Sequence, residues 1–130
     1  MANTRTYAQV SAATALGTTG VKTLIDTITL TAKAKQIMGV WAVAIGGATL
    51  TTGQPVSGVF ELESPDLSLQ PLQFPLDVVD VLTSGALAMN PHIIPVEIAC
   101  QGQERILGYI TLDLTNTGAL KGRFGIITEG

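Results

Sequence analysis

The chain has 130 residues, of which 46% are hydrophobic and only 13% are charged, with a formal net charge of −3. A chain this apolar is not disordered, and its weak acidity excludes a phosphate-binding face for nucleic acid. A single Cys excludes a disulfide scaffold and a zinc site built from several cysteines. The hydrophobic fraction is large enough for one β-sandwich domain, 1–130, to form its own core.

Glycine, proline and threonine divide the chain into short segments. The sequence contains 14 Gly, 6 Pro and 17 Thr, and no segment keeps a 3.6-residue period for three turns. Short runs of two-residue periodicity between turns are typical of an all-β sandwich or barrel. We predict strands at 4–10, 22–31, 34–45, 56–63, 67–74, 93–100, 104–114 and 120–128.

The segment 22–31 alternates with period two, which predicts a strand with one buried side. Its apolar face is formed by Leu24, Ile28 and Leu30, and Asp26 falls on the same face. A buried carboxylate needs a partner. Asp26 therefore either lies at the sheet margin or pairs with a cation of the chain or of a neighbour; the candidates are Lys22, Lys33 and Arg105.

The segment 34–45 is apolar on both faces. This pattern predicts a central strand covered on both sides, or covered by a neighbouring subunit, with Trp41 in the core. In 67–74, Pro71 predicts a strand at a sheet edge or with a bulge.

Two segments suggest helix. The better candidate is 77–89, in which Asp77 and Asp80 lie in the first turn, where the helix dipole stabilises negative charge, and Gly85 ends the helix. The segment 11–16 is compatible with a single helical turn.

The last two strands, 104–114 and 120–128, are separated by the tight loop 116–118, so we predict that they form a hairpin. Eight strands and one short helix predict an antiparallel β-sandwich of the single jelly-roll type.

No residue set in the sequence carries catalytic chemistry. His92 is the only histidine and is interpreted as a loop residue, while Cys100 ends an apolar run and is interpreted as a buried structural thiol. No nucleophile elbow, phosphate-binding loop or dinucleotide motif occurs. We therefore predict no enzyme activity, no catalytic residues, no cofactor and no metal site.

A carboxylate pair occurs in 56–63, where Phe60 and Leu62 share one face and Glu61 and Glu63 share the other. A glycosidase pair needs an apolar pocket that raises one pKa. We interpret Glu61 and Glu63 as a solvated strand face or an interface rim.

The scarcity of charge predicts self-association. A monomer of this mass exposes on the order of 6,500 Å², and its few charged side chains leave broad apolar areas of the kind that mark interfaces. Lys121 and Arg123 share one strand face. We expect them to pair with acidic residues on a neighbouring strand or on another subunit, such as Glu61 or Glu63.

The sequence carries no signal-peptide pattern at its start, and its longest apolar stretch, 37–50, is shorter than the ~20 residues of a membrane-spanning helix. We expect a protein made in the cytosol, without export and without a transmembrane segment.

The stretch 58–64 running into 72–76, within a Thr- and Gly-rich set of eight strands, resembles the small single-jelly-roll coat proteins of icosahedral DNA viruses. The resemblance implies a capsid subunit of the virion, assembled into homo-oligomeric capsomers beside other virion proteins. Arg5 is the only basic residue of the N-terminal segment, so we expect another component to neutralise the genome.

Two alternatives stay open. A phage head-decoration or tail component has the same small, β-rich, charge-poor character. A carbohydrate-binding β-sandwich module offers exposed aromatic side chains to sugar rings, and an exposed Trp41 beside Tyr109 would favour it.

Overall fold

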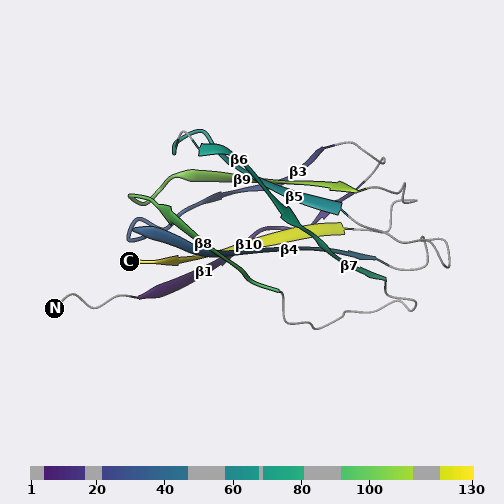
Figure 1. The fold of residues 1–130 in the computed structure, drawn as a ribbon, viewed down its shortest axis with the longest axis horizontal. Coiled ribbons are helices and arrows are strands. Elements are labelled where there is room, and N and C mark those ends of the chain that lie inside the picture. Colours follow the sequence, from purple (N-terminus) through teal and green to yellow (C-terminus); the bar gives the residue numbers. More distant parts are fainter. Residues whose placement is uncertain (1–4, 17–21, 47–57, 68, 81–91, 113–120) are drawn as a thin grey trace.

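The computed structural model describes residues 5–16, 22–46, 58–67, 69–80, 92–112 and 121–130, and this part of the chain is all-β, without a helix (Figure 1). Within these ranges ten strands are formed: β1 (Thr6–Val10), β2 (Thr14–Ala15), β3 (Thr23–Thr29), β4 (Gln36–Gly46), β5 (Gly58–Ser64), β6 (Leu69–Pro75), β7 (Asp77–Asp80), β8 (Ile94–Ala99), β9 (Arg105–Leu112) and β10 (Lys121–Glu129).

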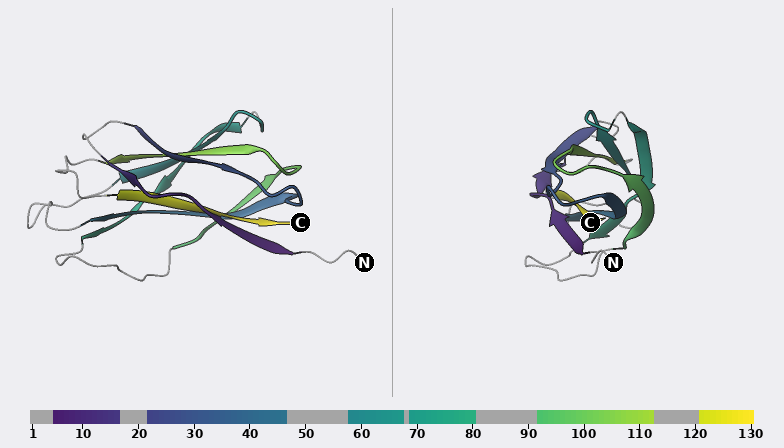
Figure 2. Two further views of the ribbon diagram at one scale, coloured as in Figure 1. Left: turned by 180° about the vertical axis from the view of Figure 1, so that it is seen from behind. Right: turned by 90° about the vertical axis from the view of Figure 1, so that its left-hand side faces the viewer.

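The strands form two sheets that lie as two layers (Figure 2). The first sheet has the order β1-β10-β4-β7; β2 also pairs with β10, and β8 also pairs with β4. The second sheet has the order β3-β9-β5-β6. Every pairing is antiparallel except that of β4 with β7, which is parallel.

The core lies between the two sheets and is built on two-residue alternation. Phe60 of β5 and Phe124 of β10 are both fully buried, and their ring centroids are 5.3 Å apart across the interface between the sheets. Leu62 is buried on the same side of β5 as Phe60, which confirms the predicted apolar face. On β9 the inward residues Ile106 and Ile110 are buried, again as the alternation predicted.

A β-bulge makes the prediction for the 22–31 face partly wrong. The register of β3 against β9 shifts between Leu24 and Asp26. The extra residue reverses the alternation, so that Ile25 is buried with Ile28 while Leu24 is 45% exposed. A bulge changes which side chains face inward without changing composition, so the alternation of residue types did not reveal it.

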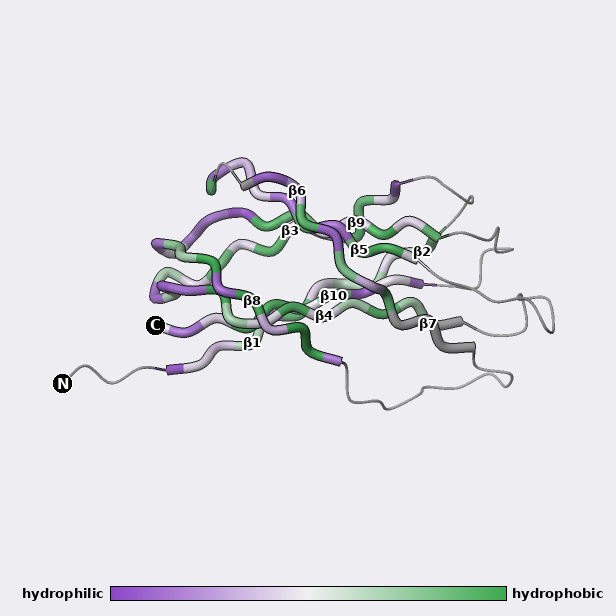
Figure 3. The backbone as a smooth tube through the Cα atoms, viewed as in Figure 1, coloured by the Kyte–Doolittle hydropathy of each residue, from purple (hydrophilic) through white to green (hydrophobic). Residues whose placement is uncertain are grey.

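The strand β4 is central, as predicted, because it lies between β10 and the pair β7 and β8. It is hydrophobic along most of its described length (Figure 3). The predicted place of Trp41 in the core is wrong, however. Val40 and Ala42 point into the core, so Trp41 points to the outer side of the first sheet, where it is half-buried.

The helix predictions are wrong where the structure describes them. Asp77–Asp80 forms the parallel strand β7, which takes up the free edge of β4, and Thr14–Ala15 forms the short strand β2 on β10. Val78 and Val79 are β-branched and favour a strand once such an edge is available. The rest of the predicted helix, 81–89, lies outside the described residues.

The predicted hairpin of the last two strands is also wrong. β9 pairs with β3 and β5 in the second sheet, whereas β10 pairs with β1, β2 and β4 in the first. Both edges of each strand are thus taken by earlier strands, and none is left for a hairpin. The loop 116–118 lies outside the described residues. Pro71 lies in β6, which is an edge strand of its sheet, as predicted.

Candidate functional site

The outer face of the second sheet carries a charged cluster, here called the Lys22 cluster, which consists of Lys22, Glu61, Glu63, Gln73 and Tyr109. Glu61, Gln73 and Tyr109 lie opposite one another on neighbouring strands, so their side chains share one face. The Lys22 ammonium contacts Glu61, lies 2.6 Å from Glu63 Oε1, and sits 4.3 Å from the centre of the Tyr109 ring. Gln73 Nε2 donates to Glu61 Oε1 at 3.1 Å.

The electrostatics of this cluster favour the charged forms of Lys22 and Glu61. The hydrogen bond from Lys22 lowers the pKa of the Glu61 carboxyl, and the two carboxylates raise the pKa of the Lys22 ammonium well above its ordinary value. A general acid needs the opposite shift, a carboxyl pKa raised toward neutrality. The geometry therefore supports the interpretation of Glu61 and Glu63 as a charged surface rather than as an acid/base pair.

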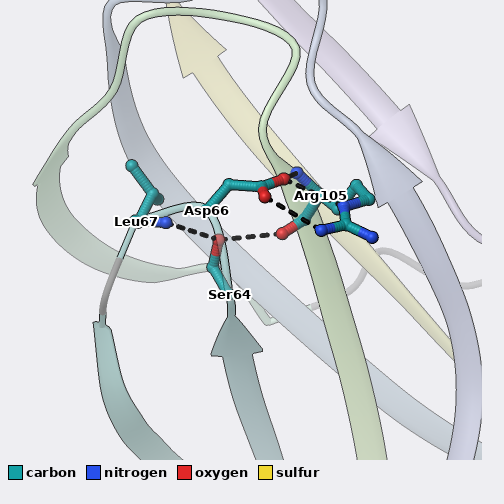
Figure 4. Close-up of polar contacts among 4 residues, drawn as sticks. All are labelled: Ser64, Asp66, Leu67 and Arg105. Carbon is teal, nitrogen blue, oxygen red and sulfur yellow. Dashed lines mark hydrogen bonds and ion pairs between the residues drawn. The ribbon is translucent and has the colours of Figure 1, made fainter.

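A second ion pair closes the turn after β5 (Figure 4). Asp66 Oδ2 accepts hydrogen bonds from the backbone N–H of Arg105 at 2.8 Å and from its Nε at 3.0 Å, and Oδ1 accepts one from Nη2 at 3.0 Å. These bonds hold the pKa of Asp66 at about 2. Ser64 Oγ donates to the Arg105 carbonyl at 2.8 Å and accepts from the Leu67 N–H at 3.3 Å. Asp66 is thus a turn clamp.

Asp26 is satisfied by backbone groups. Its Oδ2 accepts from the Ala12 N–H at 2.9 Å and its Oδ1 accepts from the Thr27 N–H at 2.8 Å. Within the described residues it forms no ion pair, because Lys22 and Arg105 are held by other carboxylates. The bulge in β3 places it partly exposed, at the margin of the apolar face, so it links β3 to the connection between β1 and β2.

Cys100 and His92 lie in different environments, the first buried and the second exposed. Cys100 is 8% exposed and faces a groove of about 510 Å³ that Glu104 also lines. Burial raises the pKa of the Cys100 thiol, and the charge of Glu104 raises it further, so the sulfur is held as a thiol. His92 is exposed before β8. No group of three or more His, Cys, Asp or Glu able to hold a metal occurs in the part of the chain that the structure describes.

The two aromatic residues considered for sugar binding lie apart. Trp41 points outward from the first sheet, and Tyr109 points outward from the second, on the opposite side of the molecule. Tyr109 is in addition occupied by the Lys22 ammonium. The structure therefore does not bring together the aromatic pair that a carbohydrate site would use.

On the outer side of the first sheet, large apolar side chains lie directly over two glycines, a feature that the sequence analysis missed. A Cβ added at Gly125 would lie 2.3 Å from the Trp41 ring, so the indole lies directly over that glycine. A Cβ at Gly39 would lie 2.8 Å from Ile93 Cγ2 and 3.7 Å from Ile127 Cβ. Glycines paired with large apolar residues on an outward face are the signal that could have found this surface.

The same outer face carries two cations at the end where β10 begins. Lys121 and Arg123 are exposed on β10, where they alternate with the inward Gly122 and Phe124. Neither forms an ion pair with another described residue, so the predicted partners Glu61 and Glu63 are not reached within one chain.

Comparison with known proteins identifies no relative, because no family model, no curated protein and no solved structure matches the chain. Within the described ranges, no helix is long and apolar enough to cross a membrane.

Proposed function

We propose that the protein is a structural shell subunit of the jelly-roll type, a capsid protein of an icosahedral DNA virus that assembles into homo-oligomeric capsomers. The observation that carries the proposal is the order of strand pairing. When β1 is counted with β2, and the short parallel strand β7 is left out, the described part of the chain has eight strands in sequence order. The first pairs with the eighth, the second with the seventh, the third with the sixth and the fourth with the fifth.

This order supports the proposed jelly roll, in which one long antiparallel hairpin curls into two facing sheets, as in viral capsid and lectin domains. Fold alone does not define function, so the proposed function also needs support from the residues at the surface. The described residues offer ion pairs that brace strands and turns, a thiol held protonated, and no metal cluster. Their outer face on the first sheet instead carries exposed apolar side chains, Val10, Met38 and Ile93, as a face that packs against other subunits would.

The proposal is tested by gel filtration with light scattering, followed by negative-stain electron microscopy of the purified protein. We expect closed oligomers that persist in both low and high salt, because apolar burial is not screened by ions. A monodisperse species of 13.5 kDa at tens of micromolar in both buffers would refute self-assembly and with it the capsid proposal.

A further inference from the structure

One end of the outer face of the first sheet, around β10 residues 121–123, combines positive charge with exposed apolar side chains. Lys121 and Arg123 supply two cations without a carboxylate partner in the described residues. Val10 is 55% exposed in the row that contains Gly125 and Trp41. Ile93 is 45% exposed next to Gly39, and Met38 is 39% exposed in the adjoining bulge of β4. These exposed apolar side chains lie around the two glycines described above.

The outer face of the second sheet has the complementary character. Two carboxylates, Glu61 and Glu63, share the single ammonium of Lys22, which leaves one net negative charge in the Lys22 cluster. Exposed apolar side chains lie beside it. Leu24, 45% exposed, is opposite Tyr109, and Val59, 39% exposed, precedes Glu61 by two residues on the same face. This face is therefore acidic and apolar, whereas the first is basic and apolar at the end that carries Lys121 and Arg123; Glu97 and Glu129 lie toward its other end.

We propose that these two faces are the two halves of one contact between copies of the chain: the first-sheet face of one copy docks on the second-sheet face of the next. The inference rests on the proposed self-assembly and names its interface. Apolar residues form the centre of the contact, and Lys121 and Arg123 of one copy meet the acidic Lys22 cluster of its neighbour at the rim.

The molecule has room for such contacts. A standard interface takes roughly 800 Å² from each partner, and the accessible surface of the chain is 7412 Å², so two such patches occupy about a fifth of it. Because the two patches differ and lie on opposite faces, the contact is heterologous. Such contacts build rings when the rotation between copies closes, and filaments when it does not.

Charge inversion of one face at a time tests the contact. The variant K121E/R123E makes the first-sheet face acidic. The variant K22E/E61K/E63K reverses the Lys22 cluster while keeping opposite charges within it. Each variant alone presents two faces of like charge, so its association should weaken by about tenfold or more in sedimentation equilibrium.

An equimolar mixture of the two variants should regain the association of the wild type. In the mixture every contact can join a face of one variant to the oppositely charged face of the other, so copies alternate around an even-numbered ring or along a filament. The matched control for K121E/R123E is K33E/K35E, which makes the same change in net charge as that variant on exposed residues between β3 and β4. It should associate like the wild type. Circular dichroism establishes that each variant folds.

If K22E/E61K/E63K does not fold, K121Q/R123Q serves in its place and should by itself weaken association about tenfold. Variants that fold and associate like the wild type overturn this interface while leaving the proposed function in place. Folded variants that are weakened but do not recover on mixing overturn the pairing of the two faces. A wild-type chain that is monomeric overturns both the interface and the proposed function.

Discussion

Replacing Gly108 with Ala tests how tightly the two sheets are packed. Gly108 lies on β9 and faces Phe124 of β10, and a Cβ at this position would lie 2.5 Å from Phe124 Cε1 and 2.6 Å from Cδ1. The ring cannot withdraw easily, because it is fully buried and packed against Phe60. One methyl group must therefore either separate the sheets or force the ring off its preferred rotamer.

Overpacking of a close-packed core costs about 1–3 kcal/mol, and we expect Gly108→Ala to fall in this range. Phe124→Leu alone should cost roughly 1–2 kcal/mol through lost burial. The double variant should be more stable than the sum of the two costs predicts, by about 1 kcal/mol, because leucine leaves room for the added methyl group.

Equilibrium unfolding in guanidinium chloride, at one fixed protein concentration, gives the free energy of unfolding for all four proteins. The matched control is Gly58→Ala at the first residue of β5 in the same sheet, where an added Cβ would meet the far end of the Leu76 side chain at 2.7 Å but also the Thr111 carbonyl at 2.9 Å. The cost of Gly58→Ala in free energy of unfolding should not change when Phe124 is replaced. Strictly additive costs for Gly108→Ala and Phe124→Leu would refute the account of sheet packing.

Three further predictions concern the connections. Gly102→Ala should lower the free energy of unfolding by about 1–3 kcal/mol, because Gly102 has a φ of +98° and its Cβ would lie 2.4 Å from the Ala32 carbonyl oxygen; an unchanged denaturation midpoint would contradict this. The low pKa of Asp66, about 2 against an ordinary 3.8, stabilises the fold above pH ~4 and is lost as the pH falls toward 2. The melting temperature of the wild type should thus fall toward that of Asp66→Asn across this range, and a constant difference would argue against the Arg105 clamp. Cys100 should react slowly with a thiol reagent in the native protein and rapidly after unfolding, because it is buried with a raised pKa; fast native reaction would show that the thiol is accessible.

The all-β class and the inward faces of the regular strands could be predicted from sequence because alternation is local. Phe60 and Leu62 on β5, and Ile106 and Ile110 on β9, are buried as their two-residue spacing required. This reasoning works only while the register is unbroken. At the bulge in β3, Ile25 replaces Leu24 in the core, and nothing in the residue types marks that position.

Partnership between strands could not be predicted, because it depends on long-range competition for edges. The short spacing of β9 and β10 along the chain favoured a hairpin, but strands in both sheets compete for them and each ends in a different layer. Trp41 was misplaced for a related reason. An apolar residue on an outward face resembles a core residue until the glycine beneath it, Gly125, is seen.

The positions of the charged residues could also be predicted from sequence only in part. Glu61 and Glu63 were expected on one surface face, and the structure places them there, but the cation that joins them, Lys22, was found only once β3 and β5 were known to flank β9. Asp26 was expected either at a sheet margin or in an ion pair, and backbone donors satisfy it at the margin.

The position of β9 and β10 has a consequence for the order in which the chain can fold during synthesis. β10 joins β1 to β4, and β9 joins β3 to β5, so each sheet is bridged by a strand that the ribosome makes after the strands it connects. Before β9 emerges neither layer can be completed, and before residue 121 emerges the first layer still lacks the strand that joins β1 to β4. Folding of a chain dominated by such distant pairings is slow and exposes edges that aggregate. The complete two-sheet core therefore forms only after β10 has left the exit tunnel, and until then the apolar strands of the first sheet keep unpaired edges.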